Sequence, residues 1–100
     1  MEFSIELTKK SKFRKAELSF LKESGSWIYL PQSIEITTDS KSKPIILDLR
    51  NNENEKVTIS GNFKGKQIHF KISNFDKIPE GSPGSGNSPW TFLDEIRVLR

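Results

Sequence analysis

The stretch Ile68-His69-Phe70-Lys71-Ile72 alternates strictly between apolar and polar side chains. Because successive side chains of a β-strand point to opposite faces, this pattern predicts a strand that is buried on one side. The same alternation recurs in 3–7, 16–20, 34–37 and 57–59. No segment repeats apolar residues at helical spacing over three turns. The chain is therefore predicted to be all-β.

Two further patterns extend this fold prediction. The segment Pro44–Leu49 is nearly continuous in aliphatic residues, which predicts a strand covered on both faces. Turn-forming residues separate the predicted strands, at 23–26, 39–42, 51–54, and at Gly61-Asn62 with Gly65. Roughly seven or eight short, half-polar strands cannot bury their apolar faces in one flat sheet. We therefore predict one domain over residues 1–100, built as a β-sandwich or jelly roll.

Composition excludes several classes of protein. There is no cysteine, so neither a disulfide framework nor a thiolate metal site can form. This fits a cytoplasmic protein without excluding an exported one. No apolar run approaches the roughly 18 residues of a membrane-spanning helix, and no signal peptide is recognisable at the N-terminus. Because a strand pattern begins directly after Met1, we expect an excised piece of a longer chain, trimmed at its N-terminal side.

The net charge is +3, from 16 basic and 13 acidic residues. One dense basic cluster stands out, in Lys9, Lys10, Lys12, Arg14 and Lys15. Nucleic-acid binders carry a more lopsided charge and place aromatic residues between the basic ones for stacking. Only Phe13 lies within this cluster, so we interpret it as a solvated loop between two strands. Neither nucleic acid nor a membrane is predicted as a partner.

The segment Glu80–Pro89 contains nothing apolar except prolines. Its composition is that of a flexible linker. It lies between two strong strand patterns, however, which fixes both of its ends. We therefore predict a long ordered surface loop, a kind of segment in which binding functions are often found.

At this loop the sequence resembles a known family. The run Lys77-Ile78-Pro79-Glu80-Gly81-Ser82-Pro83-Gly84-Ser85-Gly86, followed by Trp90-Thr91-Phe92-Leu93-Asp94-Glu95-Ile96, is similar to the end of bacterial family 20 glycoside hydrolases. These β-N-acetylhexosaminidases carry a discoidin-like, galactose-binding-fold domain after the catalytic barrel. A second run, Phe20-Leu21-Lys22-Glu23-Ser24-Gly25-Ser26-Trp27-Ile28-Tyr29-Leu30-Pro31, resembles an upstream segment of the same domain. The resemblance spans most of residues 3–100.

The resemblance implies a non-catalytic accessory domain whose partner is the catalytic domain of the same polypeptide. It also implies a periplasmic or extracellular location for the parent protein. The chain departs from the family at Ser82, where the family has histidine, and at His69, where related domains often have arginine. It lacks the early strands and the loop that help bind a structural calcium ion in related modules. No cofactor is therefore predicted, although Glu95 is kept as a candidate calcium ligand.

The adjacent carboxylates Asp94 and Glu95 are of the type that family 20 enzymes use in catalysis, but that pair belongs to the barrel. Neighbouring side chains of a strand diverge unless a bulge intervenes. The sequence also offers no further acid or nucleophile to complete a site. We predict no catalytic residue in this chain and interpret the pair as structural.

A second hypothesis is a carbohydrate-binding module that tethers the enzyme to glycans. Trp27 and Tyr29 are predicted to share one face and could stack on a sugar ring, and Asn87 could bond to its hydroxyl groups. Trp90 is in phase with Phe92, Ile96 and Val98, so we predict it in the core or at its edge. His69 is predicted on the surface, because one histidine without further ligands cannot build a zinc site.

Overall fold

The computed structural model describes residues 1–40 and 43–100. These residues form a five-stranded antiparallel sheet with the order β3-β2-β4-β1-β5. The elements are β1 (Glu2–Leu21), the short 3-10 turn η1 (Ser24–Ser26), β2 (Ser33–Thr38), β3 (Ile45–Asp48), β4 (Lys56–Ser73) and β5 (Phe92–Leu99). The prediction of an all-β chain is confirmed. No helix among the described residues is long and apolar enough to cross a membrane.

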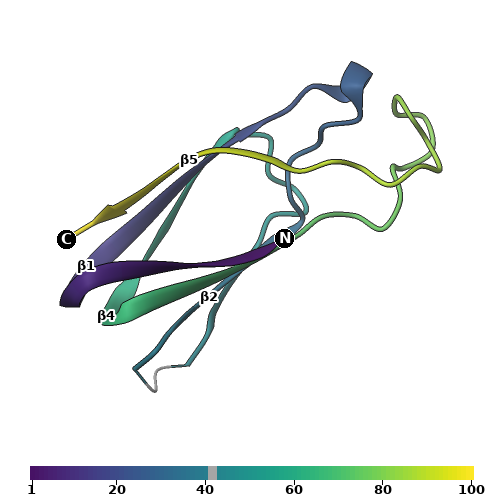
Figure 1. Ribbon diagram of the computed structural model, residues 1–100. Coiled ribbons are helices and arrows are strands. Elements are labelled where there is room, and N and C mark those ends of the chain that lie inside the picture. Colours follow the sequence, from purple (N-terminus) through teal and green to yellow (C-terminus); the bar gives the residue numbers. More distant parts are fainter. Residues whose placement is uncertain (41–42) are drawn as a thin grey trace.

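Two long strands organise the sheet. β1 has 20 residues and β4 has 18, and they pair with each other from Glu2 opposite Lys71 to Ser19 opposite Lys56. Both strands bend sharply at the same end of the molecule, so that each runs out and back (Figure 1). The register between them shifts within residues 6–11 and again within 13–15. Such irregularities let a paired ribbon bend, because an unpaired residue locally increases the twist.

The bend makes the two halves of the sheet face each other. β2 pairs with the second half of β4, and β3 pairs with β2. β5 pairs with the second half of β1, in the other half of the sheet. The described chain is elongated, with extents of 46 × 20 × 20 Å. This arrangement fits a β-sandwich made from one folded sheet.

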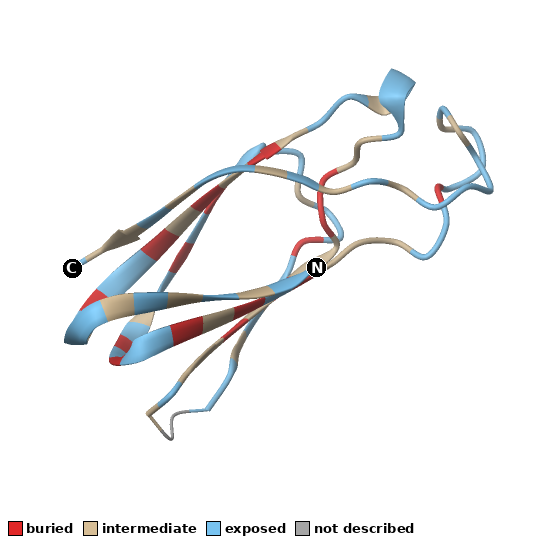
Figure 2. Cartoon of the chain, viewed as in Figure 1, coloured by how far each residue is buried: buried red, intermediate tan, exposed pale blue. Residues whose placement is uncertain are grey.

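The core lies between the two halves and takes side chains from both. Its buried members alternate along the strands with exposed residues (Figure 2): Phe13, Ala16, Leu18, Phe20, Leu30, Ile34, Ile36, Leu49, Val57, Ile59, Phe63, Ile68, Phe70 and Ile72. Ring stacking adds to this packing at Phe3 with Phe70 and at Phe13 with Phe63. The predicted alternations at 16–20, 34–37, 57–59 and 68–72 therefore identify core strands correctly.

Two details of the sequence-based fold prediction are wrong, and a third is only partly covered by the described residues. The basic cluster at 9–15 and the segment Gly61–Gly65 were both expected to be loops, yet they lie within β1 and β4 at the bend. The described residues form five strands rather than seven or eight, because the sequence pattern of each bent strand resembles that of two short ones. The turn expected at 39–42 can be placed only in part, since Lys41 and Ser42 lie outside the described residues.

The strand predicted over 44–49 is also not covered on both faces. β3 spans Ile45–Asp48 at the edge of the sheet, where Ile46 is 68% exposed. Only alternate residues of this strand, Ile45 and Leu47, pack against the core. A continuous aliphatic run therefore does not distinguish a central strand from an edge strand that leaves one face open.

Candidate functional site

Two distant segments meet at the end of the molecule opposite the bend. We call residues 24–31 and 78–90 together the loop cluster (Figure 1). The backbone N–H of Trp90 donates to the carbonyl of Trp27 at 2.7 Å, and the N–H of Tyr29 donates to the carbonyl of Trp90 at 3.0 Å. Ile28 and Trp90 thereby form a parallel bridge. The two runs that carry the family resemblance are thus joined by main-chain hydrogen bonds.

The glycine-rich segment of the loop cluster is ordered, as predicted. Tight turns follow one another, in which the N–H groups of Ser82, Ser85 and Asn87 donate to carbonyls three residues earlier. The segment is closed at its base by two hydrogen bonds between Ile78 and the 86–87 backbone. Ile78 itself is buried and anchors the loop. Glycines occur where the turns need a positive φ, as at Gly84 and Gly86.

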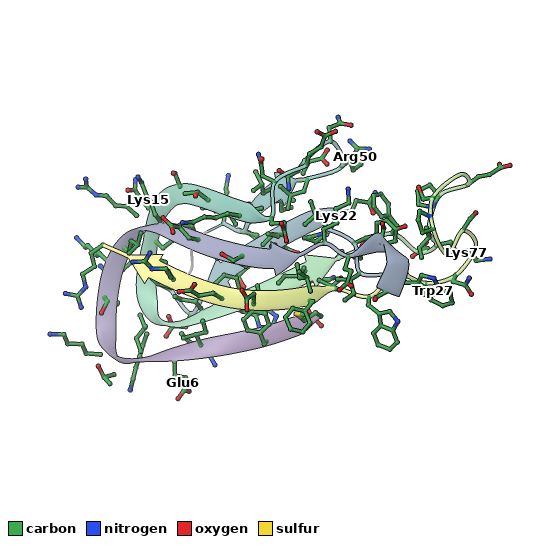
Figure 3. All side chains as sticks on the ribbon, turned by 90° about the horizontal axis from the view of Figure 1, so that it is seen from above. Glu6, Lys15, Lys22, Trp27, Arg50 and Lys77 are labelled. Carbon is green, nitrogen blue, oxygen red and sulfur yellow. The ribbon has the colours of Figure 1, made fainter. Side chains whose placement is uncertain are left out.

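Trp27 lies directly against this loop. Its backbone is left-handed, with φ 62°, which is unfavourable for a bulky residue by about 1 kcal/mol. A Cβ added to Gly84 would lie 2.5 Å from Cδ1 and Nε1 of the indole, so only glycine lets the loop approach it. The Trp27 side chain extends from η1 at this end of the molecule (Figure 3), and the residue is 38% exposed.

Tyr29 and Asn87 also converge on the loop, but their polar groups are engaged in it. The Tyr29 hydroxyl donates to the carbonyl of Pro83 at 2.7 Å. The Asn87 side-chain amide donates to the carbonyl of Gly84 at 3.0 Å. The three predicted carbohydrate-contacting residues, Trp27, Tyr29 and Asn87, therefore come together at one loop. Two of them use their donors to hold its shape.

The hollow next to Tyr29 is small. Its volume is about 90 Å³, well below the roughly 300 Å³ at which small-molecule sites usually begin. Among its lining residues are Leu30, Leu49 and Phe75. A sugar bound at this end would therefore lie on the surface, against the open part of Trp27.

The prediction that Trp90 lies in the core or at its edge is wrong. Trp90 is 67% exposed and Phe92 is 50% exposed. The reason is a β-bulge in β5: Ser19 pairs with Glu95 and Phe20 pairs with Leu93, which leaves Asp94 between them without a partner. The bulge shifts the alternation by one residue, so that Ile96 faces the core while Trp90 and Phe92 do not.

The same bulge explains why the side chains of both Asp94 and Glu95 are exposed. Both residues are exposed, whereas Leu93 before them and Ile96 after them pack against the core. The two carboxylates are thus brought to the outside together. Within residues 1–40 and 43–100, no group of three or more acidic or histidine residues is placed to hold a metal ion. Glu95 remains a prediction as a calcium ligand, without side-chain partners in that part of the chain.

His69 lies on the outer face of β4, as predicted. Its Nδ1 is 2.8 Å from the Ser4 hydroxyl, and its Nε2 is 3.5 Å from the Glu2 carboxylate. The side chain is 43% exposed. These contacts link β4 to the first residues of β1.

Sequence reasoning missed Asn74, which ties the loop cluster to the sheet. Its side-chain amide donates to the Tyr29 carbonyl at 3.1 Å and to the Thr91 hydroxyl at 2.8 Å, while its carbonyl oxygen accepts from the N–H of Phe75. One side chain therefore fastens three segments. A single asparagine after a strand carries no signal that would have indicated this role.

Comparison with known proteins adds no relative: no protein-family model matches the chain, and no curated protein matches it. The resemblance to family 20 hydrolases therefore rests on the two runs at 20–31 and 77–96. The structure shows that these two runs are in contact in the loop cluster, and what this contact means for function is taken up as a proposal below.

Proposed function

We propose that the chain is the C-terminal, galactose-binding-like accessory domain of a bacterial β-N-acetylhexosaminidase. In this role it is non-catalytic, and it supports the catalytic barrel of the same polypeptide structurally. The parent enzyme acts in the periplasm or outside the cell. The observation that carries the proposal is that the two runs resembling the family meet in one loop cluster, through Trp27 and Trp90.

The exposed aromatic side chains at this end favour packing against another domain. Trp90 and Phe92 are two residues apart on the side of the chain that the bulge turns away from the core, and Trp27 lies next to Trp90. Large apolar side chains gathered on a protein surface usually mark an interaction site, since their exposure to water is unfavourable. In the proposed role these residues contact the barrel.

The coding sequence upstream of Met1 tests the family assignment. A family 20 barrel encoded in frame before Met1 supports the proposal. A different catalytic domain, or no preceding domain, contradicts it.

A double variant tests the proposed contact in the parent enzyme. Trp90→Ala with Phe92→Ala removes exposed apolar area, so we expect hexosaminidase activity to be lost at a lower temperature. Ile46→Ala is the matched control, because Ile46 is equally exposed but lies on the edge strand β3. Equal inactivation temperatures for the double variant and the control would contradict the contact.

A carbohydrate-binding module is the second candidate function. It is supported by the convergence of Trp27, Tyr29 and Asn87 on one loop and by the open part of the Trp27 side chain. Titration with N-acetylglucosamine, galactose and mucin-type glycans, followed by amide NMR shifts, separates the two candidates. Shifts confined to the loop cluster favour sugar binding, whereas uniformly unshifted amides exclude it for these sugars.

A further inference from the structure

A second hollow lies at the bend, at the opposite end from the loop cluster. Its volume is about 600 Å³, within the range of small-molecule sites. Its lining comes from β1, from β4 and from the residue after β5: Lys12, Phe13, Arg14, Asn62, Phe63, Lys64 and Arg100. Lys12 and Arg14, which line it from β1, belong to the basic cluster for which a loop is predicted. The bend therefore turns that cluster into part of a concave surface.

The charge of this hollow is one-sided. Lys12, Arg14, Lys64 and Arg100 line it, and no acidic side chain does. In the part of the chain that the structure describes, none of these four cations forms an ion pair. Side chains with nitrogen atoms at their tips surround the bend, near the labelled Lys15 (Figure 3). An anion entering here meets cations that form no side-chain ion pair among the described residues.

Two of these cations repel each other across the β1–β4 pair when no anion is bound. Lys12 and Lys64 are directly opposite each other in the β1–β4 register. Like charges at directly opposed positions destabilise a sheet, so the pair favours an anion that binds between them. Asp39, which the sheet brings near Lys66, accepts a hydrogen bond from the backbone N–H of that residue and does not line the hollow.

The hollow also has a rigid apolar part. Phe13 and Phe63 stack with their ring centroids 4.9 Å apart, and both are almost fully buried. A register shift between Phe13 and Lys15 leaves Arg14 unpaired with β4, and Arg14 and Asn62 also line the hollow. Because both rings are turned into the core, the surface that the hollow offers to a ligand comes mainly from the basic and amide side chains, which suit a compact compound that carries anionic groups.

We propose that this hollow binds a sugar that carries sulfate or phosphate ester groups. The cations contact the ester oxygens of the sugar. The choice of a sugar rests on the proposed function, whereas the anion site rests on the hollow alone. A nucleic acid fits less well, because the described aromatic residues at the bend are buried and offer no open face for base stacking.

The experiment is an NMR titration of the full chain at low salt with four probes. They are a trisulfated heparin-type disaccharide, glucose 1,6-bisphosphate, the unsulfated disaccharide and a short oligothymidylate. We expect the sulfated or phosphorylated sugar to shift the amides of 12–14 and 62–64, and added salt to weaken binding. The unsulfated disaccharide should leave these amides unchanged. The ester that binds more tightly identifies the natural group.

Paired variants assign the binding to this hollow. Lys12→Gln with Lys64→Gln should weaken binding by about tenfold, since two charge-assisted contacts are lost. The control, Lys22→Gln with Lys77→Gln, removes the same charge at the loop end (Figure 3) and should change affinity little. Removing the repulsion between Lys12 and Lys64 should not unfold the protein, so a folded NMR spectrum is expected for both variants.

Three results would overturn the proposal. The first is the absence of shifts with either charged sugar, and the second is an equal loss of affinity in the two paired variants. The third is tighter binding of oligothymidylate than of both sugars, which would assign the hollow to nucleic acid. None of these results bears on the loop cluster or on the upstream coding sequence, so failure here and failure of the accessory-domain proposal are distinguishable.

Discussion

Single residues determine how closely the glycine-rich loop can approach Trp27. Gly84 and Gly86 both have positive φ, 81° and 86°, but only Gly84 has the indole next to its Cα. A side chain at either position strains the backbone, and a side chain at Gly84 also collides with the ring. This pair therefore separates the cost of backbone strain from the cost of lost packing.

We expect Gly86→Ala to lower the free energy of unfolding by about 1 kcal/mol, through strain alone. Gly84→Ala should lower it by about 3 kcal/mol, because the loop must also move away from Trp27. Urea unfolding followed by tryptophan fluorescence measures both values. Equal losses would show that Trp27 and Gly84 are not in contact.

Asp39 links the end of β2 to the bend of β4. Backbone N–H groups, of which Gln67 contributes most and Lys66 less, hold the pKa of Asp39 below its ordinary value of 3.8. A carboxyl group with a lowered pKa stabilises the fold above its unfolded pKa, and this contribution is lost as the pH falls through the folded pKa. The stabilisation from Asp39 is therefore present at neutral pH and disappears in acid.

The expected result for Asp39→Asn is a lower stability than the unmodified chain at pH 7. The difference between the two proteins should shrink as the pH falls through the lowered folded-state pKa of Asp39, because the carboxylate of the unmodified chain is then protonated. Urea unfolding across this range measures it. A difference that stays constant with pH would contradict the assigned role of the charge.

Among the elements, β5 shows how one bulge changes the face of a strand. Asp94 is the residue without a partner, and the alternation of inward and outward side chains differs on its two sides. Phe92 is half exposed, whereas Leu93 packs against the core. Strict alternation counted back from Ile96 would place Phe92 in the core, whereas the bulge leaves it half exposed.

Truncation distinguishes the two assignments. Phe92→Ala should cost less than about 1 kcal/mol in unfolding free energy, since much of the ring is already in water. Leu93→Ala should cost about 2 kcal/mol, because it leaves a gap next to the core. Chemical denaturation of the two variants provides the comparison. A larger loss for Phe92→Ala than for Leu93→Ala would place the bulge elsewhere.

The positions of the strands were largely predictable from the sequence, but the sequence did not reveal that β1 and β4 each run unbroken through a bend. Alternation identified the core residues of β2 and of both halves of β1 and β4, because burial on one face imposes a period of two. The bends in β1 and β4 contain glycines and lysines, which are also typical of turns. Only the pairing between the two strands reveals that Gly61 and Gly65 lie inside one strand.

The candidate sites were predictable to different degrees. The loop cluster was found through the resemblance and the glycine content of 80–89. The hollow at the bend was missed, because Lys12 and Lys64 are far apart in the sequence and become opposite only through the register. Asn74 was missed for a similar reason, since its partners come from two other segments.

In the molecule as a whole, the two ends differ in chemistry. The loop cluster exposes aromatic side chains, and the bend exposes cations around a hollow. An accessory domain with this layout can contact a catalytic barrel with its aromatic end and an anionic sugar with its basic end. The two contacts do not compete for the same surface.

Hydrogen exchange tests the accessory-domain role most directly. The measurement compares the 100-residue chain with the complete product of the coding sequence that contains it, peptide by peptide. We expect a family 20 barrel in the complete product, and slower exchange at 27–29 and 88–92 than in the isolated chain. A complete product without that barrel, or unchanged exchange in both segments, would contradict the accessory-domain role.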